Sequence, residues 1–179
     1  MPKVVDLNKL ITDKERKKAS VCGNIGIWFE SNAILNALVK RILKSDTCFV
    51  MGCAAWLTNT RIIGALSTLK GVSVICTRDK VVKAMKPKYR LLPKHDDIPT
   101  VLVLGTAGRK ASLMHHKFLV GMDKDQKPIW VSTGSFNLTQ SATTNLENLM
   151  IIESPEVAEV YLKEFQRLYP LARTLRLYK

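Results

Sequence analysis

The chain has 179 residues, of which 46% are hydrophobic, so it can form one domain with a substantial core but is too short for two. It carries 28 Lys and Arg residues against 15 Asp and Glu residues, which gives a formal net charge of +13. This charge indicates a polyanionic partner, with nucleic acid as the first candidate. A basic solvated surface or attraction to an anionic membrane fits the same charge.

Neither a signal peptide nor a membrane span is predicted. The first six residues lack a long apolar core, and nowhere do about eighteen apolar residues follow one another. We therefore expect a cytoplasmic protein without a membrane partner. The four cysteines show no CxxC spacing and are predicted to be reduced core thiols rather than zinc ligands.

The first predicted elements follow a polar arm. Residues 1–20 end in a run of charges and are predicted to form a basic arm or solvated helix, ahead of a domain at residues 21–170. A basic tail is expected at residues 171–179. Within the domain, residues 25–30 predict a short strand, and residues 32–44 predict a helix because apolar side chains recur at helical spacing.

Strands and helices then alternate along the chain. Residues 47–53 predict a buried strand, residues 59–70 a helix that Gly71 ends, and residues 72–77 a further strand. Connections of helix length between strands favour parallel pairing. The predicted fold class is therefore α/β, with a mixed, largely parallel β-sheet flanked by helices in a single domain.

Basic residues are densest between residues 78 and 94. Cations along a phosphate backbone, beside an aromatic platform such as Tyr89, suit nucleic acid and a single strand in particular. A solvated helix with its loop explains the same residues equally well. A glycine-containing loop at residues 105–110 could also contact phosphate or form only a turn. The residues predicted to bind nucleic acid are Arg78, Lys80, Lys83, Lys86, Lys88, Arg90, Arg109 and Lys110.

Three short motifs follow, and the first is HHK at residues 115–117. It lies in a strand predicted at residues 113–120, in which side chains alternate between the two faces. His115 and Lys117 therefore share one face, and His116 is predicted to face the other way as a packed or hydrogen-bonded histidine. A neutral imidazole can attack phosphorus, and the ammonium can hold a phosphate oxygen while it disfavours the charged imidazolium.

The second motif is GSFN at residues 134–137, after a strand predicted at residues 129–133. Its glycine permits a sharp turn, Ser135 can cap a helix, and the turn offers N–H groups to an anion. Ser135 and Asn137 add neutral donors for phosphoryl oxygens. The third motif is NLEN at residues 145–148, in which Glu147 can accept a ring N–H of a histidine and fix its tautomer.

In this order, each beside a strand, HxK, GSxN and NxEN resemble the motifs of the phospholipase D superfamily, in particular its single-motif nuclease branch. The resemblance covers about the last half of the chain. It implies an endonuclease that cleaves DNA or RNA through a phosphohistidine, without a metal ion or cofactor. The roles that it implies are His115 as the nucleophile, Lys117 and Asn137 as holders of the non-bridging oxygens, Ser135 as a support of these groups or of the turn, and Glu147 as the group that orients an imidazole.

One position departs from the family pattern, which has an aspartate five residues after the lysine. Met122 stands there and Asp123 follows one residue late, so the carboxylate faces the other way unless a bulge restores it. This departure leaves open a second function, a nucleic-acid-binding module of the same fold without turnover. Hydrolysis of a phospholipid headgroup is a third, and the lack of a strongly amphipathic basic helix counts against it.

HxK occurs once, yet displacement at phosphorus needs one group to attack and a second to protonate the leaving oxygen. A two-fold homodimer with the active site at its interface would supply two copies of His115. The resemblance implies the same arrangement. If the acid lies within the chain instead, His95 and His116 are the first candidates.

Overall fold

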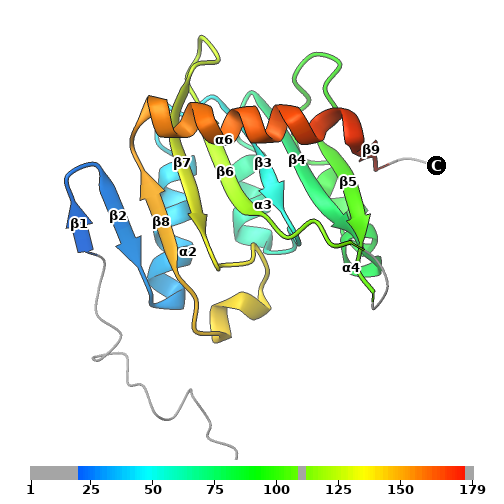
Figure 1. Ribbon diagram of the computed structural model, residues 1–179, viewed down its shortest axis with the longest axis horizontal. Coiled ribbons are helices and arrows are strands. Elements are labelled where there is room, and N and C mark those ends of the chain that lie inside the picture. The colour runs from blue at the N-terminus through cyan, green and yellow to red at the C-terminus, as the bar shows by residue number, and fades with distance from the viewer. Residues whose placement is uncertain (1–19, 109–111, 176–179) are drawn as a thin grey trace, which may run out of the picture.

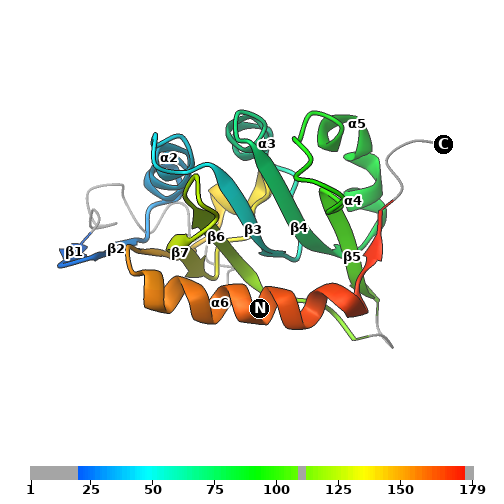
Figure 2. The same cartoon turned by 90° about the horizontal axis from the view of Figure 1, so that it is seen from above.

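The structure is a computed structural model that describes residues 20–108 and 112–175. Apart from its last residue, the arm predicted at residues 1–20 lies outside the described residues. The described chain folds into a mixed sheet of nine strands with helices on both faces (Figures 1 and 2). This confirms the predicted α/β class and the single domain. No helix of the described part is long and apolar enough to cross a membrane.

The strands lie side by side in the order β1-β2-β8-β7-β6-β3-β4-β5-β9. Their bounds are β1 Ser20–Cys22, β2 Ile25–Trp28, β3 Phe49–Ala54, β4 Gly71–Arg78, β5 Val101–Thr106, β6 Lys117–Met122, β7 Pro128–Gly134, β8 Leu149–Ile152 and β9 Arg173–Thr174. Only β3 with β4 and β4 with β5 are parallel. The expectation of a largely parallel sheet is corrected, because only these three neighbouring strands pair in parallel, whereas β6, β7 and β8 follow one another as an antiparallel meander.

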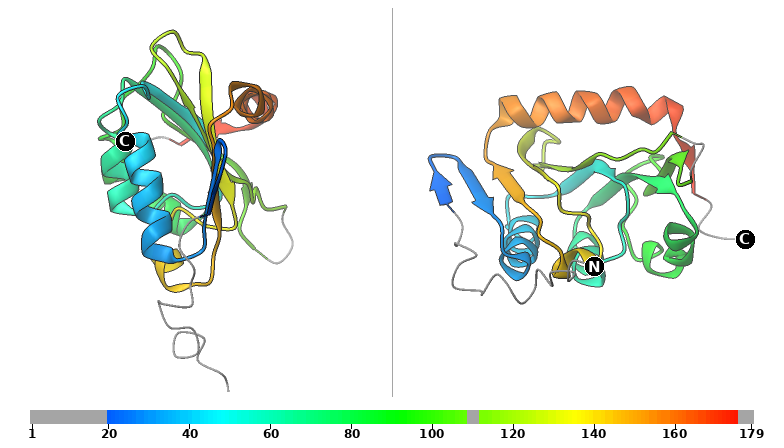
Figure 3. Two further views of the ribbon diagram at one scale, coloured as in Figure 1. Left: turned by 90° about the vertical axis from the view of Figure 1, so that its left-hand side faces the viewer. Right: turned by 60° about the horizontal axis from the view of Figure 1, so that its bottom comes forward.

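Helices cover the two faces of the sheet unequally (Figures 2 and 3). One face carries α2 Ser31–Ile42, α3 Thr60–Leu66, α4 Lys80–Ala84 and α5 Lys86–Tyr89, and the other carries α6 Pro155–Leu168. Two 3-10 turns complete the described chain, η1 Ser141–Thr144 and η2 Tyr169–Leu171. The longer helices begin at polar caps: Glu30 accepts backbone N–H groups of α2, and Ser154 accepts one of α6.

Each face of the sheet packs against its own apolar core. Leu119 lies in the core under α2 and α3, whereas Phe118 and Val120 lie in the core under α6. This alternation agrees with the predicted facing of the strand that follows His115. Cys53 and Cys76 are buried thiols in these cores, and burial raises the pKa of each to about 12, so both are unreactive.

Part of the predicted tail belongs to the sheet. Strand β9 pairs with β5, and Leu175 is buried in the core under α2 and α3. The domain end expected at residue 170 is therefore too early. The backbone groups of β5 would otherwise form an unpaired edge, and a short partner strand satisfies some of them.

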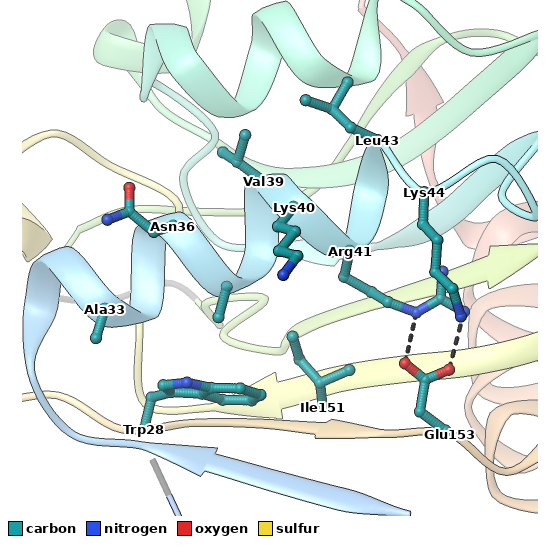
Figure 4. Close-up of a pocket in the computed structure, with 11 residues that line it drawn as sticks. Trp28, Ala33, Asn36, Val39, Lys40, Arg41, Leu43, Lys44, Ile151 and Glu153 are labelled. Carbon is teal, nitrogen blue, oxygen red and sulfur yellow. Dashed lines mark hydrogen bonds and ion pairs between the residues drawn. The ribbon is translucent and has the colours of Figure 1, made fainter. Parts of the chain in front are cut away.

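Arg41 holds the end of α2 against the sheet (Figure 4). Its buried guanidinium donates to both carboxylate oxygens of Glu153 at 2.7 and 2.9 Å, and to Asp46 Oδ1 at 2.7 Å and Thr47 Oγ1 at 2.8 Å. It also lies 4.9 Å from the centre of the Trp130 ring. These contacts tie the C-terminal ends of α2 and β8 to the loop before β3.

Candidate active site

The three motifs meet at one end of the strands, along the lower edge of the sheet in Figure 1. This edge is that line of strand ends and not an outermost strand. Because β6 runs antiparallel to β3 and β7, and β8 runs antiparallel to β7, this edge collects the ends of β3 and β7 and the starts of β6 and β8. HHK leads into β6, which begins at Lys117; GSFN begins at Gly134, the last residue of β7; and NLEN directly precedes β8. Strand pairing therefore brings together segments that are separated along the chain.

His115 and Lys117 form the centre of this edge. Lys117 Nζ lies 3.2 Å from each ring nitrogen of His115 and donates to the His115 carbonyl oxygen at 3.0 Å. The backbone around them is anchored on both sides: Thr77 Oγ1 donates to the Met114 carbonyl, and Ala55 N donates to the His116 carbonyl at 3.1 Å. The imidazole and the ammonium thus share one face, as the alternation predicts.

The charges around this pair keep the imidazole neutral. The pKa of His115 is lowered, first by partial desolvation of its ring and then by the positive charges of Lys117 and His116. Desolvation also lowers the pKa of Lys117, while the carboxylate of Glu147 opposes that shift. A neutral imidazole therefore stands beside an ammonium near neutral pH, which is the combination needed for attack on a phosphodiester.

Hydrogen bonds lock GSFN to NLEN. Ser135 Oγ donates to Glu147 Oε2 at 2.5 Å and accepts from Asn148 N at 3.0 Å, while Ser135 N donates to Asn148 Oδ1 at 2.7 Å. Gly134 has a φ of +154°, and a Cβ there would lie 2.4 Å from the Asn148 carbonyl oxygen. Only glycine allows the two segments to approach this closely.

Two motif residues differ from their predicted local roles. Ser135 does not cap a helix, since no helix follows it directly; its hydroxyl is used by Glu147 and Asn148 instead. Glu147 accepts from Ser135 and, at 3.4 Å, from Asn145 Nδ2, and none of its hydrogen bonds in the described chain reaches a histidine. The predicted contact between Glu147 and an imidazole is therefore not made within one described chain.

Asn137 also lies in this region and is partly buried. Its Oδ1 atom is buried and has no hydrogen-bond partner among the described residues. An unpaired buried amide is costly unless another group completes it. The role predicted for Asn137 at a phosphate oxygen stays a prediction.

Trp56 is a site residue that the sequence did not indicate. It follows β3, and its ring stands edge to face with that of His115, with centroids 5.9 Å apart and an interplanar angle of 83°. Its Nε1 donates to Asp79 Oδ2 at 3.3 Å. In the sequence, Trp56 is only a loop residue after a strand; the order of strands in the sheet shows that this loop lies beside the start of β6.

The other two histidines lie away from His115. His116 faces α6, where its Nε2 lies 3.2 Å from Glu164 Oε1, and it is half exposed rather than part of the core. His95 packs against Phe49, with ring centroids 4.6 Å apart, at the start of β3. Because the site lies at the end of β3, about 17 Å of strand separates His95 from it.

The departure at residue 122 concerns the far end of β6. Met122 is buried in the core under α6, and Asp123 Oδ1 accepts from the N–H groups of Asp125 and Lys127, both at 2.9 Å, in the turn to β7. At about 3.3 Å per residue, β6 separates this turn from Lys117 by roughly 20 Å. The register shift between β6 and β7 occurs at this same distant end. Asp123 therefore shapes a turn and not the site.

The predicted nucleic-acid-binding residues fall into three groups. Arg78, Lys80 and Lys83 are exposed and line a pocket of about 360 Å³ together with Asp79, Thr106 and Ala107. Lys86, Lys88 and Arg90 lie on or directly after α5, outside this pocket. Arg109 and Lys110 lie outside the described residues.

Tyr89 cannot act as the expected aromatic platform. Its side chain is 0% exposed, and its hydroxyl donates to the Leu57 carbonyl at 2.6 Å. The physical cause is that the short helix α5 turns Tyr89 into the core under α2 and α3, where burial of its large apolar ring stabilises the fold.

The described residues contain no group of three or more His, Cys, Asp or Glu side chains arranged to hold a metal ion. The polar groups of the three motifs at this edge of the sheet are imidazoles, an ammonium, a hydroxyl, amides and the carboxylate of Glu147. These groups suit nucleophilic displacement with charge stabilisation by the protein itself.

Comparisons with known proteins concern the family and the fold of the chain. A family profile described as cardiolipin synthase, PLD-like domain, matches residues 38–169. An uncharacterised protein of Acanthamoeba polyphaga mimivirus is 28% identical in an alignment that covers 93% of this chain and 72% of that protein.

Solved structures with a similar fold include two named as Nuc proteins. Nuc from Salmonella typhimurium, described as a phospholipase D family member, has a TM-score of 0.64 at 20% identity, covering 85% of this chain and 97% of that one. NucT from Helicobacter pylori has a TM-score of 0.67 at 18% identity, covering 84% and 98%. Phosphatidylserine synthase from Haemophilus influenzae has a TM-score of 0.63 at 11% identity, covering 87% and 39%.

Proposed function

The chain belongs to the PLD-like domain family, and we propose that it is a phosphodiesterase that cleaves DNA or RNA through a phosphohistidine. The observation that carries the proposal is the contact of Lys117 Nζ with both ring nitrogens of His115, at 3.2 Å, on an edge shared with GSFN and NLEN. The similarity of fold to Nuc and NucT over almost their whole lengths supports it.

In the proposed reaction, a ring nitrogen of neutral His115 attacks the phosphorus atom. A P–N bond forms while the bond from phosphorus to the leaving oxygen breaks, and an acid protonates that oxygen. Water then attacks the phosphohistidine and gives its proton to the group that served as the acid, while the P–N bond breaks and releases a phosphate monoester and the free imidazole. Lys117 and Asn137 hold the non-bridging oxygens, and Ser135 with Glu147 fixes the loop beside them.

We propose that a second copy of the chain supplies the acid. The sequence has three histidines, and His116 pairs with Glu164 on the other face while His95 lies at the opposite edge of the sheet. A two-fold homodimer with its site edges facing each other would bring in the partner's imidazole. That imidazole would also give Glu147 the contact that it does not make within one described chain.

Exposed apolar side chains beside the site support this arrangement. Phe29 is 53% exposed directly after β2, Leu113 is 40% exposed beside HHK, and Leu146 is 46% exposed within NLEN. Because β2 ends beside the start of β8, while Leu113 is bridged to Gly105 of β5, the three side chains are spread along this edge. Exposed large apolar side chains along one edge suit a surface that another protein covers.

Nucleic acid is the substrate that the charges favour. The formal net charge is +13, and exposed Arg78, Lys80 and Lys83 line a pocket at the same edge of the sheet. A phospholipid is the second candidate, but the likeness to phosphatidylserine synthase is 11% in sequence and concerns the fold. The alternative of a binding module without turnover rests on the departure at Met122, which lies at the far end of β6 in the core under α6, and the cleavage assay decides between the two.

The test is cleavage of plasmid DNA, single-stranded DNA and RNA by the purified protein in the presence of a chelator, with phosphatidylcholine vesicles as a separate arm. We expect nucleic acid to be cleaved by the wild-type chain and by His116→Ala, but not by His115→Ala, which should still bind. Loss of activity on chelation with rescue by magnesium would contradict the mechanism. Headgroup release without nucleic acid cleavage would select the second candidate.

A further inference from the structure

Trp56 and the neighbouring cationic pocket extend the site beyond the reacting groups. We propose that they bind the nucleotide next to the scissile phosphate, with Trp56 stacking on an unpaired base and Arg78, Lys80 and Lys83 holding the next phosphate. This inference rests on the proposed function, and it names the substrate class as single-stranded nucleic acid.

The indole of Trp56 is held in a defined orientation between the nucleophile and the pocket. The ring is partly buried against the core under α2 and α3, packs edge to face with His115 at 5.9 Å, and donates from Nε1 to Asp79 Oδ2 at 3.3 Å. Asp79 is itself fixed, because its Oδ1 accepts from Val81 N at 2.8 Å as the cap of α4. An aromatic ring pre-set in this way loses little conformational freedom when a base stacks on it.

The pocket continues from this same carboxylate. Asp79 lines it together with Arg78, Lys80 and Lys83, so the lining carries three positive charges and one negative charge. The Asp79 carboxylate already accepts hydrogen bonds from an indole and a backbone N–H. The excess positive charge suits a phosphate. Trp56 thus lies between a group that attacks one phosphate and a pocket that can hold a neighbouring one.

This order of groups distinguishes a single strand from a duplex. A base can stack on a side chain only when it is unpaired and turned away from its neighbours, and every base offers a ring face for such stacking. A duplex would have to unpair and unstack that base first, which opposes binding. We therefore expect little base preference and a clear preference for single strands. Since Tyr89 is buried, Trp56 carries the role that the sequence suggested for Tyr89.

The first experiment measures binding, so that it does not depend on turnover. In full-length His115→Ala chains, dissociation constants are compared for an oligonucleotide, the same oligonucleotide with abasic positions, and its duplex. We expect Trp56→Leu to weaken single-strand binding about 5- to 100-fold, as loss of one stacked base does, and to leave abasic and duplex binding nearly unchanged. Trp56→Phe should keep most of the affinity. Trp28→Leu, at a partly buried tryptophan in the groove of Figure 4, is the matched control and should bind normally.

The second experiment tests the pocket through its salt dependence. Replacing Lys80 and Lys83 by Gln should reduce the slope of log affinity against log salt by about 1.4, because each lost phosphate contact on a single strand contributes about 0.7. Replacing Lys124 and Lys127 by Gln in the turn between β6 and β7 removes the same charge at the opposite edge of the sheet. That control should leave the slope almost unchanged.

The results separate this inference from the proposed function. If the wild-type chain cleaves nucleic acid but Trp56→Leu binds normal and abasic strands as the parent does, the stacking subsite is refuted and the nuclease stands. Equal losses on normal and abasic strands would also refute it, because they would reflect damage to the site. The abasic comparison in the parent chain needs no Trp56 variant, so it remains decisive if Trp56→Leu does not fold. Equal salt slopes for the two lysine pairs would refute the phosphate pocket.

Discussion

Mixing wild-type and His115→Ala chains tests whether two chains share one reaction centre. His115 is exposed, precedes β6, and its side chain contacts Lys117 and Trp56, so its loss should cost less than about 0.5 kcal/mol of stability. Mutant and wild-type chains should therefore pair at random. In an equal mixture, about a quarter of the dimers then carry two copies of His115, half carry one and a quarter carry none.

The structure determines what the mixed dimers can do. Within a chain, the alternative acids are out of reach, since His116 is paired with Glu164 on the other face and His95 is about 17 Å of strand away. Mixed dimers should be inactive. The activity of the mixture should be about a quarter of that of the same total amount of wild-type protein, against about a half if each chain holds a complete site.

The assay is the initial rate on single-stranded DNA after the chains have been unfolded together and refolded, with differently tagged chains to show that exchange is complete. Wild-type chains mixed with His116→Ala are the matched control and should retain nearly full activity. A residual rate of one half, or a monomer that is fully active during sedimentation, would refute a shared centre.

Three further predictions concern single residues. Desolvation and the charge of Lys117 lower the pKa of His115, and the neutral imidazole is the form that attacks. The acid limb of the profile of kcat/KM against pH should therefore lie below the ordinary histidine pKa of about 6.5. Lys117→Met should move both this acid limb and the NMR titration of His115 to higher pH. Tyr89→Phe should lower the free energy of unfolding in denaturant by about 1–3 kcal/mol, because the Leu57 carbonyl loses its hydrogen-bond donor. Nucleic acid binding should stay unchanged, and weaker binding by the folded variant would contradict the buried role of Tyr89. Gly134→Ala should cost about 1–3 kcal/mol and most of the activity, because its Cβ would meet the Asn148 carbonyl; a wild-type melting temperature would contradict this.

The sequence was most informative where one local pattern determines the structure. The two-residue period of a strand predicted that His115 and Lys117 share one face and that His116 faces the other way, although the strand begins only at Lys117. Helical periodicity located α2 within two residues at its C-terminal end and one at its start. These features depend on neighbours along the chain.

Features that depend on distant segments were missed. Nothing near Tyr89 in the sequence reveals that Leu57 accepts its hydroxyl, and nothing near Trp56 reveals that β6 begins beside it. Ser135 has the residue type of a helix cap, but Asn148 and Glu147 use its hydroxyl and amide. In each case the partner becomes visible only when the order of strands in the sheet is known.

The antiparallel meander of β6, β7 and β8 has a consequence for how the protein folds. The β6–β7 hairpin closes a short turn at residues 123–127, so it forms with little loss of chain entropy. The connection from β7 to β8 at residues 135–148 is longer, and β3, β4 and β5 are joined through helices. His115, Ser135 and Glu147 all flank the meander. We therefore expect their arrangement to form from local contacts early in folding, with the loop that carries Trp56 joining it only when β3 docks beside β6.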